Sequence, residues 1–197
     1  MKHTRIYFLL AALLLLAGCG RGSSFVVKST LEDARFSDRV DSVMVLNDQM
    51  QVALKAPVVN GEFTVHGKVD GAVYTWLSAL GDTRRANRPF IAEKGTVTFQ
   101  DGLACGTPLN DEDFAFTKRL QGLRDQFSGD ALKDATLKEF IDFITRHPSD
   151  PCALYAIHLG ESSRLPRAWM KQIIEAASPA IQNDTDVKAI YSLSLSE

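Results

Sequence analysis

The sequence predicts an α+β protein: an N-terminal antiparallel β-sandwich or open barrel followed by a C-terminal bundle of short helices. Residues 25–105 carry short β-rich runs separated by turn signals. From Leu109 onward, apolar residues recur with the period of a helix. We therefore expect a signal peptide over residues 1–18, a flexible tether over 19–24, a β domain over 25–106 and a helical region over 107–197.

The first segment has the layout of a secretory signal. Lys2, His3 and Arg5 form a short positive stretch, and the run from Tyr7 to Ala17 is apolar. A positive region followed by such a run is typical of a signal peptide. The run is shorter than the roughly 20 residues that a membrane-spanning helix needs.

The end of this segment, Leu16-Ala17-Gly18-Cys19, resembles the bacterial lipobox. That resemblance implies a diacylglyceryl group on the Cys19 thiol, cleavage before Cys19 and acylation of the new amino group. Several acyl chains would give stable anchoring. We expect membrane lipid as the partner of Cys19 and a location in the cell envelope, on the inner or outer membrane and facing the periplasm. A plain secretory signal is the alternative.

The β half is marked by its turns. Asn60-Gly61 separates two β-rich runs, which is a strong hairpin signal. Residues 63–69 then alternate, with Phe63 and Val65 on one face and His66 on the other. Asp70-Gly71 and Lys94-Gly95 predict two further hairpins, for a total of six or seven strands.

The helical half begins with a cap signal. Asn110 is a candidate cap, and the acids Asp111, Glu112 and Asp113 fit the first turn of a helix. Further apolar periods predict a helix that ends at Pro148, an apolar helix capped by Asp150, a helix opened by Pro166 and a last helix near Val187.

Charge and motifs exclude several classes of function. The whole chain carries 22 basic and 24 acidic residues, and loss of Lys2 and Arg5 with the signal takes its net charge from −2 to −4. Nucleic-acid binding needs a basic face, so we expect no nucleic-acid partner. The sequence contains no Gly-x-Ser-x-Gly and no phosphate-binding glycine loop. The histidines lack metal-ligand spacing, so we expect no metal, no cofactor and no enzyme.

Two cysteines remain after Cys19, namely Cys105 and Cys152. An oxidising envelope permits a disulfide between them, and two small buried thiols are the alternative. A redox-active pair is not favoured, because the chain has no Cys-x-x-Cys.

Residues 59–69, 90–97 and 106–111 carry three short motifs in a fixed order, and residues 143–148 extend the pattern. Through them the region from about Phe25 to Arg119 resembles the N-terminal domain known as domain of unknown function 4369. In envelope lipoproteins of the Bacteroides group, that domain usually precedes a thioredoxin-like domain. No Trp-Cys-x-x-Cys is present here, so we expect the accessory half alone, either as a natural short form or as a remnant of a longer gene.

Two further candidates complete the set of sites. Asp41-Ser42-Val43 resembles the O-glycosylation pattern of that bacterial group, which implies Ser42 as an acceptor. Trp76 and Trp169 are candidates for lining a pocket between sheet and helices, with a purely structural core role as the alternative.

Three functions stay open at this stage. The first is a non-enzymatic accessory or protein-interaction module of the envelope that contacts another envelope protein. The second is a small-ligand-binding lipoprotein. The third is a thiol-active accessory protein in envelope redox homeostasis.

Overall fold

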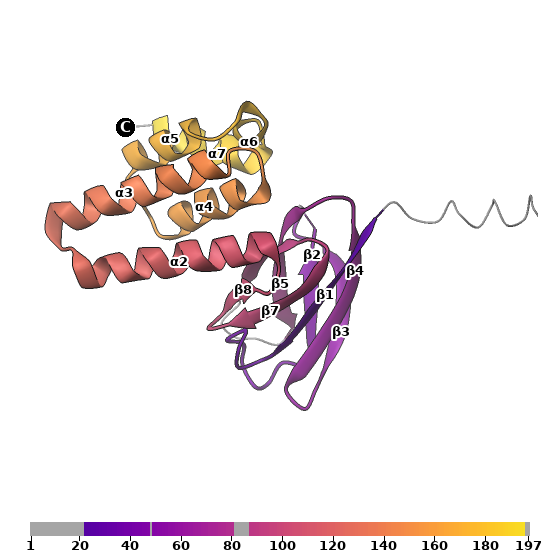
Figure 1. Ribbon diagram of the computed structural model, residues 1–197. Helices are drawn as coiled ribbons and strands as arrows, with labels where there is room; N and C mark the ends of the chain where they lie inside the picture. Colours follow the sequence, from indigo (N-terminus) through magenta and orange to yellow (C-terminus); the bar gives the residue numbers. More distant parts are fainter. Residues whose placement is uncertain (1–21, 48, 81–86, 196–197) are drawn as a thin grey trace, which may run out of the picture.

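The computed structural model describes residues 22–47, 49–80 and 87–195, which form a curved sheet followed by helices (Figure 1). The predicted α+β class is confirmed. Cys19 and the predicted signal peptide lie outside the described residues. The eight strands are β1 (Ser23–Thr30), β2 (Ser42–Leu46), β3 (Val52–Val59), β4 (Glu62–Val69), β5 (Val73–Leu80), β6 (Arg88–Ala92), β7 (Gly95–Gln100) and β8 (Leu103–Cys105).

The strands form one sheet in the order β6-β5-β2-β3-β4-β1-β7-β8. The end strands β6 and β8 contact each other, so the sheet is nearly closed into a barrel. β1 pairs with β4 antiparallel but with β7 in parallel, for example Val26 opposite Thr96. The expectation of a purely antiparallel sheet was wrong at this pair, because alternation along a strand shows which face is buried and not the direction of its neighbour.

The turns were predicted better than the pairings. Asn60-Gly61 joins β3 to β4 with φ of 53° and 79°, as a tight hairpin turn requires. The other two predicted hairpins were wrong: β5 pairs with β2 and β6, and β7 pairs with β1 and β8. A hairpin that was not predicted joins β7 to β8 through Asp101 and Gly102, with φ of 56° and 81°.

The interior of the barrel is a phenylalanine-rich core. Phe25 lies opposite Gly67, and a Cβ atom at Gly67 would come within 2.3 Å of the Phe25 ring. Glycine at this position therefore makes room for the ring. Ser23 and Ser24, predicted as part of the tether, already belong to β1 and pair with Val69 and Lys68.

The helices are α2 (Pro108–Gln126), α3 (Gly129–Arg146), α4 (Pro151–Ser162), α5 (Arg167–Glu175), α6 (Pro179–Gln182) and α7 (Thr185–Leu195). The five predicted helices are present, and the short α6 was not predicted. Phe127 follows the end of α2 and is 42% exposed. No described helix combines the length and apolar character that a membrane span needs.

The two halves share the strands β5 and β6. Phe90 is buried in the barrel, whereas Ile91 on the opposite face is buried in the helical core. Asn110 ties α2 to this strand: its Oδ1 accepts from the Ile91 N–H at 2.9 Å, and its Nδ2 donates to the Ile91 carbonyl at 2.7 Å. Asn110 is therefore not a cap, and Thr107 precedes the helix instead.

Candidate ligand pocket between sheet and helices

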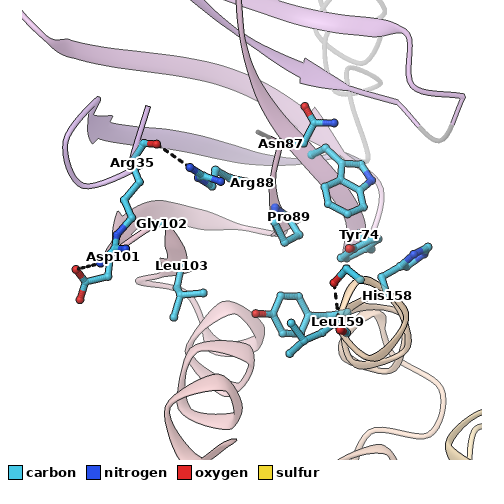
Figure 2. A pocket seen from close by; sticks show the side chains of 13 residues that line it. Arg35, Tyr74, Asn87, Arg88, Pro89, Asp101, Gly102, Leu103, His158 and Leu159 are labelled. Atoms are coloured by element: carbon cyan, nitrogen blue, oxygen red, sulfur yellow. Dashed lines mark hydrogen bonds and ion pairs between the residues drawn. The ribbon is translucent and has the colours of Figure 1, made fainter. Parts of the chain in front are cut away.

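A pocket of about 580 Å³ lies where the sheet meets α4 (Figure 2). One wall comes from β5 and β6, the second from the β7–β8 turn, and the third from α4. Strands β5 and β6 are held in place because their other face is packed into the barrel core. The lining residues are Arg35, Tyr74, Trp76, Asn87, Arg88, Pro89, Asp101, Gly102, Leu103, Tyr155, His158, Leu159 and Ser162.

Three rings form an aromatic wall, which we define as Tyr74, Trp76 and His158. The Tyr74 and His158 rings stack with centroids 5.3 Å apart and planes 7° apart. Trp76 meets both rings edge-on, at 5.3 Å from Tyr74 and 6.0 Å from His158. The rings come from β5 and α4, so the wall is built by the contact between the two halves of the chain.

Charged groups lie on the opposite side of the pocket. Arg88 donates its Nε to the Ala34 carbonyl at 2.6 Å and an Nη to the Arg35 carbonyl at 2.7 Å, which fixes its guanidinium group. Arg35 forms an ion pair with Asp101 at 3.0 Å. That contact lowers the pKa of Asp101, so its carboxylate stays ionised. This side of the pocket therefore carries two guanidinium groups, from Arg35 and Arg88, and the carboxylate of Asp101.

Burial governs the protonation of the other polar groups. Burial lowers the pKa of His158 and so favours the neutral ring. The nearby carboxylates of Asp186, Asp184 and Glu161 raise the pKa, but their effect is smaller. Burial raises the pKa of Tyr155 to about 12, and the Tyr155 hydroxyl lies 2.7 Å from Thr117 Oγ1. The pocket therefore presents neutral rings on one side and guanidinium groups on the other. A second pocket of about 340 Å³ shares the same aromatic wall.

The two tryptophans have different surroundings. Trp76 lines both of these pockets, at the predicted junction of sheet and helices. Trp169 lies on α5, half-buried against the helical core, and lines neither of them. The surroundings of Trp169 therefore match the structural alternative, a place against the helical core.

Cys105 and Cys152 are both free thiols, so the structure shows no disulfide between them. Cys105 Sγ lies 3.3 Å from Thr98 Oγ1, whereas the fully buried Cys152 Sγ donates to the Leu109 carbonyl at 3.6 Å. Burial and the nearby carboxylates raise the pKa of Cys152 far above its usual value. Its thiol therefore stays protonated in the folded protein, which argues against thiol-based catalysis at this residue.

Ser42 is 6% exposed within β2, between β3 and β5. A transferase could not reach its hydroxyl in the folded chain, so the structure argues against glycosylation there.

His66 lies exposed on β4, on the polar face that the alternation predicted. Of the acids at the start of α2, Asp111 accepts a hydrogen bond from the Gly106 N–H at 2.7 Å. Asp113 is instead only 3% exposed, which a capping role does not explain.

No family model matches this chain, and neither the curated proteins nor the solved structures include one similar to it at a significant level. The resemblance to domain of unknown function 4369 therefore stays a prediction. The pocket is interpreted below from its own geometry.

Sequence reasoning missed the charged side of the pocket. Arg35, Arg88 and Asp101 are far apart along the chain and come together only through the sheet. Among these three residues, only Asp101 had a local sequence signal for its position. Asp101-Gly102 is an Asp-Gly pair between β-rich runs, and such a pair predicts a tight turn.

Proposed function

We propose that this chain is a non-enzymatic envelope lipoprotein that binds a small ligand in the pocket between its sheet and α4. The observation that carries the proposal is the pocket itself. Its volume of about 580 Å³ falls in the usual range for small-molecule sites, roughly 300–1,000 Å³. Such sites combine apolar and aromatic walls with a few fixed polar groups, as this pocket does.

The lining favours one class of ligand. The aromatic wall offers flat apolar surface, and rings prefer stacked or edge-on contacts with other rings. The guanidinium groups of Arg35 and Arg88 are donors that suit a negative group on the ligand. A small anion with a flat apolar part meets both requirements.

The polar groups of the pocket support binding rather than catalysis. Ser162 donates its hydroxyl to the Leu159 carbonyl at 3.1 Å instead of to a base. The His158 ring stacks on Tyr74. Nucleophilic catalysis requires a nucleophile hydrogen-bonded to its base, and these contacts do not supply that pair.

The alternative function, a protein-interaction module of the envelope, has less support. It predicts an exposed apolar patch, but the exposed large apolar side chains are distributed from the turn before β3 to the end of α7. They are Met50, Val52, Val59, Val73, Leu80, Phe127, Leu193 and Leu195. Single exposed apolar residues are normal on a protein surface. Contact with another envelope protein stays a prediction.

The anchored state rests on the lipobox resemblance at Cys19. Acyl groups would add mass to the mature amino terminus, so intact mass spectrometry of the chain from its host distinguishes a lipidated Cys19 from an unmodified one. An unmodified terminus would remove the membrane part of the proposal and leave the ligand part standing.

The ligand part is tested with anilinonaphthalene sulfonate, a flat aromatic anion. In Trp169→Phe the only tryptophan left is Trp76, because the chain has two. We expect saturable one-site binding with energy transfer from Trp76 to the probe. Arg35→Gln should weaken the affinity about fivefold, because an exposed charge contact contributes up to about 1 kcal/mol.

Lys133→Gln, on the exposed side of α3, is the matched charge control and should bind as tightly as the parent chain. Probe binding that leaves the Trp76 emission unchanged would contradict the proposal, as would equal losses of affinity in the two charge variants.

A further inference from the structure

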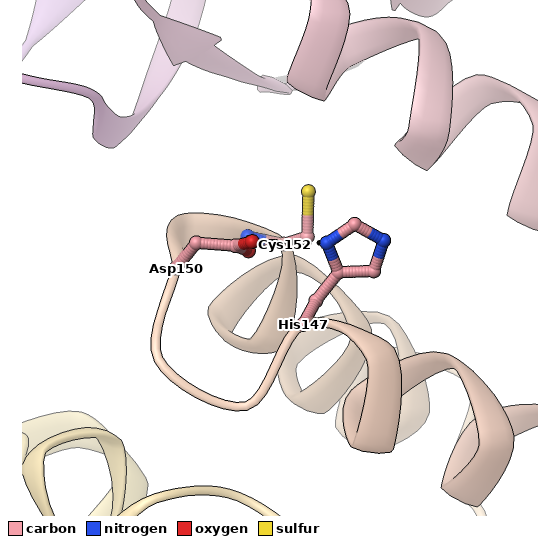
Figure 3. Close-up of side chains that lie close together, drawn as sticks. All are labelled: His147, Asp150 and Cys152. Atoms are coloured by element: carbon pink, nitrogen blue, oxygen red, sulfur yellow. Dashed lines mark hydrogen bonds and ion pairs between the residues drawn. The ribbon is translucent and has the colours of Figure 1, made fainter.

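Three potential metal ligands meet at the turn between α3 and α4. His147, Asp150 and Cys152 each place one ligand atom within 4.8 Å of the other two (Figure 3). His147 Nδ1 lies 2.9 Å from Asp150 Oδ2, and Asp150 Oδ1 accepts the Cys152 N–H at 2.9 Å. The turn is thus held in a fixed shape by its own polar groups. The spacing His-x₂-Asp-x-Cys brings nitrogen, oxygen and sulfur ligands to one point.

A fourth side chain, from α2, lies next to this cluster. Asp113 is 3% exposed, and its carboxyl oxygens meet no described hydrogen-bond donor apart from the adjacent Cys152 thiol, which is a weak one. A buried carboxyl group without a partner costs free energy, so native proteins keep one mainly where something else pairs with it.

His147 is also oriented from its far side. Its Nε2 lies 3.7 Å from Glu112 Oε2, while its Nδ1 faces the cluster. A carboxylate on one ring nitrogen and a metal on the other is a common arrangement of metal-binding histidines, because the carboxylate fixes the ring and raises its basicity. The His147 side chain is 13% exposed, so the ring is already held in place.

We propose that Asp113, His147, Asp150 and Cys152 bind one zinc ion. Thiolate, imidazole and carboxylate are the three ligand types that zinc takes, four at a time in a tetrahedron. Calcium and magnesium prefer oxygen ligands alone, so the sulfur and nitrogen atoms favour zinc over them. Zinc–ligand bonds of about 2.0–2.3 Å place ligand atoms about 3.4 Å apart, and the ligand atoms of His147, Asp150 and Cys152 already lie within 4.8 Å of one another.

Zinc binding requires both Cys152 and the buried Asp113 to release a proton, and the Asp113 proton passes to solvent as its carboxylate binds the ion. The S–H bond breaks and its proton passes to solvent, while a zinc–sulfur bond replaces a zinc–water bond. Asp150 also lines the 340 Å³ pocket next to the aromatic wall, so the ion would enter from the side of this residue. The bound ion would join α2 to the α3–α4 turn and give Asp113 a partner.

The test uses the full chain in detergent, stripped of metal with a chelator and titrated with Co²⁺. We expect one equivalent to bind, with a thiolate-to-cobalt charge-transfer absorption in the near ultraviolet, and Zn²⁺ to displace it. Cys152→Ser should lose the absorption, and the matched control Cys105→Ser should keep it. Asp113→Asn should weaken the affinity at least about tenfold.

His147→Gln is the second variant, because it keeps the sulfur in place and should weaken the affinity by a similar factor. Far-ultraviolet circular dichroism confirms that each variant is folded. Added Zn²⁺ should raise the melting temperature of the wild type and of Cys105→Ser, but not of Cys152→Ser. A wild-type chain without the charge-transfer absorption overturns the proposal, as does equal Co²⁺ affinity in wild type and Asp113→Asn.

Discussion

His158 links the sheet side of the pocket to its helical side. Its ring stacks on Tyr74 from β5, and its backbone belongs to α4. Burial lowers its pKa, although three carboxylates act on it, from Glu161 of α4, from Asp184 in the α6–α7 turn and from Asp186 of α7. The neutral ring is therefore the form that fits the folded protein, while the unfolded chain titrates near the ordinary value of about 6.5.

This difference predicts a dependence of stability on pH. The contribution of His158 is fully present above about pH 6.5 and is lost as the pH falls through its lower folded-state pKa. The free energy of unfolding of the wild type should therefore drop between about pH 7 and pH 5 by more than that of His158→Gln. Urea denaturation at several pH values measures this drop. His66→Gln, at an exposed position of β4, is the control and should follow the wild type. An identical pH dependence in His158→Gln would refute the role of the buried ring.

At the scale of elements, the barrel depends on a close contact between two strands. Phe25 of β1 covers Gly67 of β4, and this pair holds β1 in its place between β4 and β7. The local signal of Gly67 was its place in an alternating run, which predicted its face correctly. The neighbour of β1 could not be predicted, because the pairing with β7 joins residues about 70 positions apart in the chain.

Gly67→Ala should destabilise the protein by about 1–3 kcal/mol, because the added methyl group would overlap the Phe25 ring in a packed core. Gly122→Ala is the matched control within α2, where a Cβ meets only the end of the Gln126 side chain at 3.9 Å. It should stabilise the protein by about 0.5–1 kcal/mol through helix propensity. Chemical denaturation of both variants measures the two changes. A neutral Gly67→Ala would show that β1 packs differently.

At the scale of the whole molecule, the sequence predicted the order of its parts but not how they meet. Trp76, a candidate for a pocket between sheet and helices, lines two pockets at that junction, and its role in binding stays a prediction. The acids around Asp113 were interpreted as helix caps, although Asp113, Phe116, Thr117 and Leu120 share the i, i+3, i+4, i+7 spacing of one face. That spacing was the available signal for a buried acid. The charged side of the pocket had no such signal, since the sheet topology assembles it.

The central claim is that the junction between sheet and α4 holds a small ligand. Native mass spectrometry of the chain purified from its host's membranes tests this most directly. We expect wild type and Trp169→Phe to carry one additional small mass, and Trp76→Ala to have lost it. A wild-type chain without a bound mass, or the same mass retained by Trp76→Ala, would contradict the claim.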